Sequence, residues 1–366
     1  MTRIGICVLK TYDVGGAEIL ASKLSAELQS KGYAVEMVEV PSYAIPGPTI
    51  SRLYRGSGLE KAIAGAASIA DSWMNFVKIS LRRLDFDALA TFGYSCHYLR
   101  HPKMIVYFLS HDKIAYDAGY PAEGSLTPAE RLGRKVYATS RRLIDKSLVK
   151  RLRTETPVFA ASRNVARRLR NYWQISARGI IYPGGFDPSF YYESRDYVLY
   201  FGRLDWSAKR MNLVYRVAEK LPSISFLVAG GPVHPLVNPA VFNPPRNVKL
   251  QLFKGLCPME EKRRIYARAS CILFPTYDED FGIVPIEGMS AGKPCVACTD
   301  GGGVTETIVQ GKTGLLVPPK VESLAEAVSE LHTHGGSMRT ECRKRAELFS
   351  WDNCLSQLAS EVERIL

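Results

Sequence analysis

Short apolar segments alternate with amphipathic segments along the whole chain, and this alternation constrains the fold more than any other feature. Candidate strands of the first half lie at Ile4–Leu9, Ala34–Val40, Ala88–Thr91, Met104–Leu109, Pro157–Ala160 and Ile180–Tyr182. Candidate helices lie between them near Ala17–Lys31, Leu59–Arg83, Pro128–Leu152 and Arg163–Trp173. The second half repeats the pattern, with strands at Tyr197–Phe201, Ser225–Ala229, Val248–Leu252, Cys271–Phe274, Pro294–Cys298 and Gly314–Val317. Apolar strands separated by helices indicate parallel sheets covered on both faces.

The sequence divides at Tyr182–Pro188, where the letters YPGGFDP cluster residues that break regular structure. A chain of 366 residues is too long for one ordinary core and long enough for two domains. We therefore expect two doubly wound α/β domains, residues 1–185 and 186–350, that bind ligands at the carboxyl ends of their strands. A last helix, residues 351–366, carries its own apolar stripe and is expected to pack back on the first domain.

The net charge of +12 comes entirely from the first half of the chain. Residues 1–185 contain 27 Lys and Arg against 15 Asp and Glu, whereas residues 186–366 contain 21 of each. A basic surface confined to one half predicts a phosphate-rich partner or an anionic membrane surface for that half. Charge spread over exposed helices for solubility is the alternative.

Targeting and cysteine signals both indicate a protein of the cytoplasm. No apolar run approaches the roughly 18 residues of a spanning helix, and the N-terminus reads as a strand rather than as a signal peptide. Eight cysteines in a chain of this length are not a disulfide framework. Cys295 and Cys298 have redox spacing but begin a candidate strand, so we expect no redox or metal role for them.

The segment from Phe274 to Pro294 contains the most informative motif of the chain. A strand ends at Phe274, a turn carries Glu279 and Gly282, and a helix is expected to begin near Pro285, a favourable first helical residue. Free backbone N–H groups at such a helix N-terminus form an anion site.

Glu279 and Glu287 flank this turn, Glu287 in the first helical turn, with Phe281, Gly282 and Ile283 between them. The spacing allows one carboxylate to bind a sugar and the other a ribose while the amides between them hold phosphates.

These residues resemble glycosyltransferase family 4. The resemblance consists of two glutamates separated by seven residues, the intervening Phe281-Gly282, the strand start Gly292-Lys293-Pro294 and the loop Gly301-Gly302-Gly303. It implies the GT-B fold, with the two domains facing each other across a cleft, and retaining transfer from a nucleotide sugar. Glu279 is then expected to bind the hydroxyls of the transferred sugar.

A second segment agrees with the resemblance. Phe201-Gly202-Arg203 ends the first strand of the second half, and Lys209 follows six residues after Arg203. The family uses an arginine and a lysine at this spacing to neutralise the donor diphosphate. Charge grows on the leaving nucleoside diphosphate as the glycosidic bond breaks, so fixed cations stabilise the transition state selectively. An arginine and a lysine on a solvated loop are the alternative.

Two features of the first half also match the family. Gly15 and Gly16 follow the first strand and open a helix, where glycines allow close approach to the donor phosphates; a purely structural turn is the alternative. His111 follows the strand Met104–Leu109, where family members place a histidine against the transferred sugar. A loop histidine with a local backbone partner remains the alternative for His111.

Two further positions concern the nucleotide and a metal. Lys254, after the strand Val248–Leu252, matches the position where related enzymes bind the edge of the base. Asp278-Glu279-Asp280 has the form of a metal signature. Because the family handles the diphosphate with cations and amides, we expect no metal and no cofactor besides the nucleotide-sugar co-substrate.

The helical stretch that starts at Pro128 is strongly basic. Its cations are Arg131, Arg134, Lys135, Arg141, Arg142, Lys146, Lys150, Arg151 and Arg153, interleaved with an apolar stripe. A basic amphipathic helix can lie on anionic lipid headgroups. An ordinary covering helix with a basic outer face is an equal alternative.

We therefore predict a metal-independent, retaining hexosyltransferase that uses a UDP-sugar in preference to a GDP-sugar. The expected acceptor is a sugar or glycan, lipid-linked, in the synthesis of surface polysaccharide or glycolipid. The expected location is the cytoplasm or the inner face of the membrane. No covalent nucleophile stands out, which favours a front-face route, although a carboxylate such as Asp13 could intervene. A nucleotide-sugar epimerase, a phosphorylase and a nucleic-acid-binding protein are the alternatives, the last without a visible reader motif.

Overall fold

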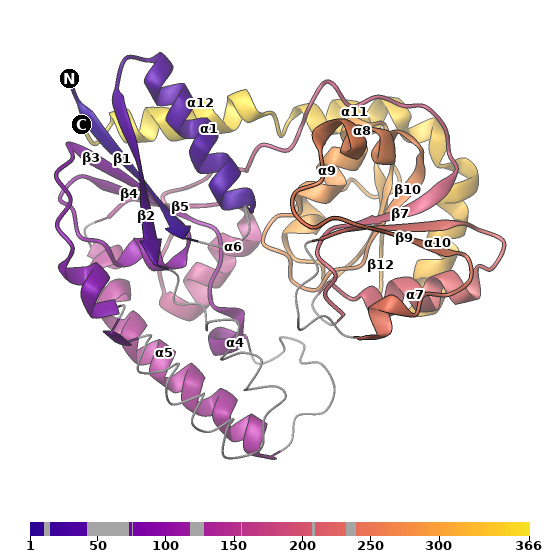
Figure 1. Cartoon of the computed structure of the whole chain (residues 1–366), viewed down its shortest axis with the longest axis horizontal. Helices are drawn as coiled ribbons and strands as arrows, with labels where there is room; N and C mark the ends of the chain where they lie inside the picture. Colours follow the sequence, from indigo (N-terminus) through magenta and orange to yellow (C-terminus); the bar gives the residue numbers. More distant parts are fainter. Residues whose placement is uncertain are drawn as a thin grey trace. The chain divides into compact units, whose positions relative to one another are not determined.

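The computed structural model describes residues 1–10, 15–41, 73–74, 76–117, 128–154, 156–206, 209–231 and 239–366. The chain forms two compact units (Figure 1). Unit 1 contains Met1–Ile181 together with Leu355–Leu366, and unit 2 contains Tyr182–Cys354.

Unit 1 contains a sheet of six parallel strands in the order β2-β1-β3-β4-β5-β6. The strands are β1 Arg3–Lys10, β2 Ala34–Pro41, β3 Ala88–Phe92, β4 Met104–Phe108, β5 Val158–Ala160 and β6 Gly179–Ile180. The described α-helices that lie wholly in unit 1 are α1 Gly16–Ser30, α4 Lys113–Tyr116, α5 Pro128–Thr154 and α6 Arg163–Arg168. A 3₁₀ turn, Tyr94–Tyr98, follows β3, and a π-helical turn, Leu169–Trp173, follows α6. Strands β3, β4 and β5 are buried throughout, as expected for parallel strands covered on both faces.

Unit 2 contains a second sheet of six parallel strands, in the order β12-β11-β10-β7-β8-β9. The strands are β7 Tyr197–Phe201, β8 Phe226–Gly230, β9 Val248–Leu252, β10 Ala269–Phe274, β11 Cys295–Cys298 and β12 Gly314–Val317. The helices that lie wholly in this unit are α7 Met211–Lys220, α8 Met259–Ala267, α9 Ile283–Ser290, α10 Val321–His334 and α11 Arg339–Glu347, and α12 Trp351–Glu363 begins in it.

The core of unit 2 lies on both faces of its sheet. One apolar cluster joins side chains of α7 and α10 to the strands, and a second cluster joins side chains of α8 to the opposite face. Figure 1 shows α7 and α10 on one side of the sheet and α8 and α9 on the other. The predicted α/β class with two doubly wound parallel sheets is therefore confirmed.

The C-terminal helix α12 begins in unit 2 and ends in unit 1. Within unit 1 the Lys31 ammonium donates to the Glu363 carboxylate at 3.1 Å, and Figure 1 shows α12 beside α1. Within unit 2 the ring of Trp351, the first residue of the same helix, packs against the backbone of Gly184. A Cβ on Gly184 would lie 2.4 Å from that ring, so the contact requires glycine.

Most predicted elements appear within a few residues of the expected positions, with instructive differences. Helix α9 begins at Ile283, two residues before Pro285, because Gly282 turns the chain with a φ of 94°. Glu287 consequently lies in the second turn of α9, not in the first. The larger part of the predicted helix Leu59–Arg83 lies outside the described residues. All eight cysteines are free, and Cys295 and Cys298 are buried on β11.

Candidate functional site

The candidate site of unit 2 lies where the strand order of its parallel sheet reverses. β7 and β10 are neighbours at the centre of the sheet, and the chain leaves them toward opposite edges. Ligands of doubly wound sheets bind where the strand order reverses, outside the carboxyl ends of the strands. The loop with Arg203 and Lys209 follows β7, and the loop with Glu279 follows β10. The two predicted motifs are therefore neighbours in space.

Glycines bring backbone segments together at this edge of the sheet. A Cβ on Gly230, the last residue of β8, would lie 1.7 Å from the carbonyl oxygen of Gly202. Gly202 itself has a φ of 144°, a conformation that L side chains rarely adopt. The predicted glycine at the end of β7 is thus required by the backbone, whatever it does for a ligand.

Lys209 and Glu279 form an ion pair between the two loops. Both side chains are largely buried, and the Lys209 ammonium also lies 5.7 Å from the centroid of the Phe274 ring. The Arg203 side chain is exposed, while its carbonyl oxygen accepts a hydrogen bond of 2.6 Å from the Tyr200 hydroxyl. Burial raises the pKa of Tyr200, with the negative charges of Asp205 and Glu279 adding to the shift and Arg203 opposing it. Arg203, Lys209 and Glu279 are therefore close enough for their charges to act on the same buried phenol or on one another.

The loop after β10 is held by the triple-glycine loop after β11. The Glu279 N–H donates to the Gly301 carbonyl at 3.0 Å, and the Gly303 N–H donates to the Glu279 carbonyl at 2.8 Å. A Cβ on Gly303 would lie 2.4 Å from the Asp280 carbonyl oxygen. The two loops thus pack backbone against backbone, and only glycine fits at Gly303.

The N-terminus of α9 was predicted to bind an anion, and among the described residues its start has no side-chain cap. The third helical residue, Pro285, has no N–H to satisfy. Phe281 is buried, with its ring stacked on Tyr182 at 5.3 Å and near Phe349 at 5.5 Å, so it anchors the turn. The amides at Gly282 and Ile283 follow directly. Uncapped amides together with the helix dipole favour a bound phosphate.

Glu287 is held by two side chains of α8 that sequence reasoning missed. The Tyr266 hydroxyl donates to Glu287 Oε2 at 2.8 Å, and the Lys262 ammonium pairs with Oε1. A lysine four positions before a buried tyrosine, on one face of a helix, was the available signal.

Sequence reasoning also missed the pair formed by Arg210 and Asp300. The guanidinium donates two hydrogen bonds of 2.7 Å to the two carboxylate oxygens, and it lies over the Tyr277 ring. This pair ties the residue after Lys209 to the loop after β11. Lys254 is exposed in the turn after β9, and its predicted contact with a base stays a prediction.

In unit 1, Gly15 and Gly16 begin α1 after the first strand. The Gly15 N–H donates to the Glu18 carboxylate at 2.8 Å, which is the glutamate half of a capping box at the start of the helix. Asp13 lies outside the described residues. The Gly15 amide therefore has a partner within its own turn, and the predicted contact of Gly15 and Gly16 with donor phosphates stays a prediction.

His111 lies buried among aromatic rings of unit 1. Its ring centroid is 4.6 Å from that of Trp173, 4.7 Å from that of Phe108, and close to those of Tyr116 and Tyr172. The imidazole is 4% exposed. It follows β4 as predicted, and its predicted contact with the transferred sugar stays a prediction.

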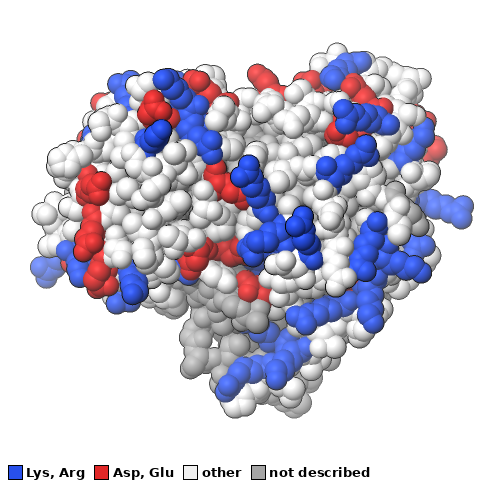
Figure 2. Space-filling model, turned by 180° about the vertical axis from the view of Figure 1, so that it is seen from behind, with Lys and Arg blue, Asp and Glu red and all other residues white. Residues whose placement is uncertain are grey.

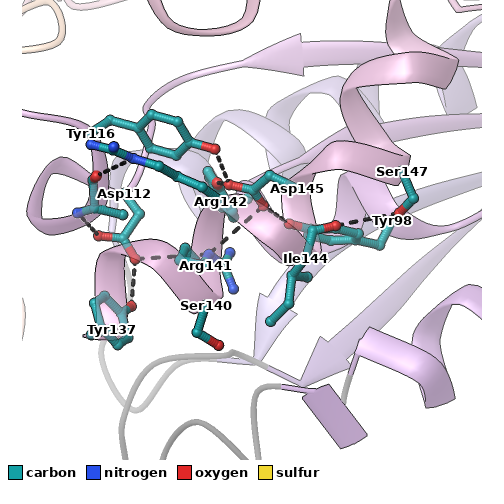
Figure 3. A network of polar contacts seen from close by, with 12 residues as sticks. Tyr98, Asp112, Tyr116, Tyr137, Ser140, Arg141, Arg142, Ile144, Asp145 and Ser147 are labelled. Carbon is teal, nitrogen blue, oxygen red and sulfur yellow. Dashed lines mark hydrogen bonds and ion pairs between the residues drawn. The ribbon is translucent and has the colours of Figure 1, made fainter. Parts of the chain in front are cut away.

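Beside this cluster, unit 1 contains a buried polar network that the sequence did not reveal (Figure 3). Asp145 of α5 is fully buried and accepts hydrogen bonds from the hydroxyls of Tyr94, Tyr98 and Tyr116. The guanidinium Nε of Arg141 lies 3.9 Å from carboxylate oxygens of both Asp145 and Asp112. Burial raises the pKa of Asp145, while Arg141 and the three phenols oppose this shift.

The network ties α5 to the segments that follow β3 and β4. Asp112 also accepts a hydrogen bond of 2.5 Å from Tyr137 of α5 and caps the short helix α4. Two charges four residues apart, inside the apolar stripe of α5, were the available sequence signal. In the described part of the chain, no three His, Cys, Asp or Glu side chains are grouped as metal ligands.

Residues 186–349 match the family described as glycosyl transferases group 1. The D-inositol 3-phosphate glycosyltransferase of Mycobacteroides abscessus is 31% identical over 180 residues, which cover 46% of this chain and 39% of that protein. An alpha-1,3/1,6-mannosyltransferase of Dictyostelium discoideum is 42% identical over 72 residues, or 20% of this chain and 17% of that one. The aligned part thus spans two fifths or less of these relatives.

Solved structures resemble the chain over its full length. Sucrose-phosphate synthase from Thermosynechococcus elongatus superimposes with a TM-score of 0.71 at 18% identity, covering 100% of this chain and 99% of that one. An Anabaena protein crystallised with UDP and glucose superimposes with a TM-score of 0.65 at 14% identity, covering all of both chains. The chain therefore has the GT-B fold over its full length, and residues 186–349 match the family of group 1 glycosyl transferases.

Proposed function

We propose that this protein transfers a hexose from a nucleoside diphosphate sugar, with UDP preferred, to a sugar or glycan acceptor with retention at the anomeric carbon. The observation that carries the proposal is the meeting of Lys209, Glu279 and the open N-terminus of α9 at the strand-order reversal of unit 2. Cations, free amides and a carboxylate at one edge match the diphosphate and the sugar of such a donor.

Each donor-site group has a distinct task in this proposal. Arg203, Lys209 and the amides of α9 bind the diphosphate and stabilise the charge that grows on it as the glycosidic bond breaks. When the diphosphate engages Lys209, Glu279 is released from its ion pair and can accept hydrogen bonds from sugar hydroxyls. Glu287 binds the ribose. Exchange of one partner for another avoids leaving a buried charge unpaired, which would cost several kcal/mol.

The proposed route to retention is a front-face displacement. The bond from the anomeric carbon to the β-phosphate oxygen breaks, the acceptor oxygen bonds to the same face, and the departing phosphate oxygen takes the acceptor's proton. The nucleoside diphosphate leaves with the bonding electron pair. This route is metal-independent and needs no cofactor and no covalent nucleophile. The family resemblance supports it, and His111 is the proposed contact to the sugar.

The acceptor side is assigned to unit 1, whose helix α5 supports a lipid-linked acceptor at an anionic membrane surface. Exposed cations at Lys135, Lys146 and Lys150 accompany exposed apolar side chains, Leu132 and Leu143. Figure 2 shows Lys and Arg gathered over the part of unit 1 that contains α5. In the described ranges, no helix is long and apolar enough to cross a membrane. Peripheral contact at the cytoplasmic face is the proposed location.

Product analysis tests the proposal. The purified chain is incubated with UDP- and GDP-hexoses and an acceptor panel of lipid extracts, free sugars and D-inositol 3-phosphate, which the relatives' names specify. We expect a new glycoside with release of UDP, detected by mass spectrometry, and loss of UDP binding in Arg203→Ala and Lys209→Ala. Conversion of the nucleotide sugar without an acceptor would indicate an epimerase, and a requirement for inorganic phosphate would indicate a phosphorylase. Tight oligonucleotide binding without UDP binding would overturn the assignment.

A further inference from the structure

Four side chains of unit 2 form a compact cluster around the carboxylate of Glu287. Oε2 accepts a hydrogen bond of 2.8 Å from the Tyr266 hydroxyl, and Oε1 pairs with the Lys262 ammonium. Phe201, the last residue of β7, contacts both α8 side chains: its ring centroid lies 5.2 Å from that of Tyr266 and 5.4 Å from the Lys262 ammonium. The cluster joins β7, α8 and α9, the elements that position the proposed donor site.

The two α8 groups use half of the accepting capacity of the Glu287 carboxylate. Each carboxylate oxygen can accept two hydrogen bonds, and from the described residues each accepts one. Burial and then the charge of Glu287 raise the pKa of Tyr266, so its hydroxyl stays a donor. Each Glu287 oxygen can therefore accept one more hydrogen bond, and the contacts with Lys262 and Tyr266 fix the direction from which it comes. Two oxygens presented side by side match the two neighbouring hydroxyls of a ribose.

Lys262 differs from the other cations of its helix. Arg264 pairs with Glu261, three residues earlier on α8, and Arg263 pairs with Glu260 of the same helix and with Asp187 of the segment before β7. Lys262 instead reaches α9, and its side chain is 19% exposed, against 61% for Arg264. A partly buried lysine that crosses to another helix loses hydration and side-chain freedom, so its placement is poorly explained by solubility.

We propose that Lys262, together with Tyr266, is a positioning residue that orients Glu287 for the ribose hydroxyls of the donor nucleotide and so sets the preference for ribonucleotides. This inference rests on the proposed function, because it takes Glu287 as the ribose contact. Lys262 does not touch the reacting atoms; it acts through the carboxylate. The Lys262 ammonium and the Tyr266 hydroxyl each hold one oxygen of that carboxylate and so restrict its rotation.

The test compares binding of UDP with binding of 2′-deoxy-UDP and 3′-deoxy-UDP to the full chain by calorimetry. We expect the unmodified protein to prefer UDP by at least about tenfold, since a buried carboxylate loses a partner with either deoxy analogue. Lys262→Met should reduce this preference at least about fivefold, and Lys262→Arg should largely restore it. In transfer assays, Lys262→Met should raise KM for the nucleotide sugar and leave kcat nearly unchanged.

Two controls separate positioning from general damage. Arg264→Met removes an exposed cation of the same helix and should leave the preference intact. In a Glu287→Gln background the further change Lys262→Met should have no effect on the preference, since Lys262 acts through Glu287. An unchanged preference in Lys262→Met, or an unmodified protein that binds UDP and its deoxy analogues equally, would overturn the inference. Failure of the unmodified protein to bind any of the three nucleotides would instead overturn the proposed function.

Discussion

Lys209 of the loop after β7 is paired with Glu279 of the loop after β10, although 70 residues separate them in the sequence. The pair brings the cation expected to bind the diphosphate against the carboxylate expected to bind the sugar. Each neutralises the other, and under the proposed function a bound diphosphate separates them. This relationship makes the binding step and the transfer step separable by mutation.

Glu279→Gln should lower the rate of transfer without weakening the binding of UDP. Removing the carboxylate charge frees Lys209 for the diphosphate, so the dissociation constant for UDP should stay equal or fall. Turnover should fall about a hundredfold or more, because a neutral amide is a weaker acceptor for sugar hydroxyls and does not stabilise developing positive charge. Calorimetry and steady-state assays measure the two effects, with Glu326→Gln, an exposed residue of α10, as the control. Near-normal transfer would remove the proposed role of Glu279.

Gly282→Ala should destabilise unit 2 and weaken UDP binding. Gly282 has a φ of 94°, and a Cβ there would lie 2.6 Å from Val304 Cγ2. Backbone strain of about 1 to 2 kcal/mol therefore adds to an overlap of about 1 to 3 kcal/mol. Gly311→Ala is the matched control, since its φ is also positive at 72° but open space surrounds it. Equal losses in urea unfolding for both variants would contradict the predicted overlap at Gly282.

Lys293 predicts a pH dependence of stability. Burial, and then the charges of Arg195 and Arg339, lower the pKa of Lys293 from 10.5 to about 7. Between pH 7 and 10 the unfolded chain holds this proton and the folded chain does not, so the free energy of unfolding should rise with pH. The slope is at most about 1.4 kcal/mol per pH unit.

Lys293→Met should flatten that rise, at the cost of the hydrogen bond to the Ser194 carbonyl. Denaturant unfolding of both proteins at pH 7 and pH 9.5 measures the difference, and Lys312→Met, at an exposed position, controls for loss of a lysine. A variant whose stability rises with pH as steeply as that of the unmodified protein would show that Lys293 keeps its proton.

Asp145→Asn should destabilise unit 1 and spare unit 2. An amide oxygen cannot accept all three phenol hydrogens, and Arg141 loses a buried counter-charge, which together should cost about 3 kcal/mol or more. Hydrogen exchange should rise in β3, β4 and α5 while UDP binding persists. Asp85→Asn is the control, because Asp85 pairs with Arg3 at the surface, where ion pairs contribute little. Unchanged exchange in Asp145→Asn would argue against a stabilising network.

The triple change Lys135→Glu, Lys146→Glu and Lys150→Glu on α5 should abolish binding to anionic membranes. Each lysine near an anionic surface contributes about 1 kcal/mol, so vesicles containing phosphatidylglycerol should capture the unmodified protein and release it at high salt. Pure phosphatidylcholine vesicles should not capture it. Matched changes at the exposed Lys249, Lys312 and Lys320 of unit 2 should leave capture intact, and equal losses in both triples would indicate nonspecific attraction.

The sequence alone located the strands of both sheets and most of the helices, because apolar periodicity is a local property of each segment. It also located the motif residues Arg203, Lys209 and Glu279, since their spacing relative to strand ends is local too. It placed the start of α9 two residues late, because Pro285 is a visible signal, whereas the left-handed turn at Gly282, with a φ of 94°, is seen only in the structure.

Only the tertiary structure decided which side chains meet. Arg210 and Asp300 are 90 residues apart, and Lys262 and Glu287 are 25 apart; no local pattern couples either pair. β7 and β10 become neighbours through strand order, and Asp145 becomes a buried acceptor because α5 packs over the turns that hold three tyrosines. Partner choice for buried charges is set by the whole fold, since each charge must find a counterpart when water is removed.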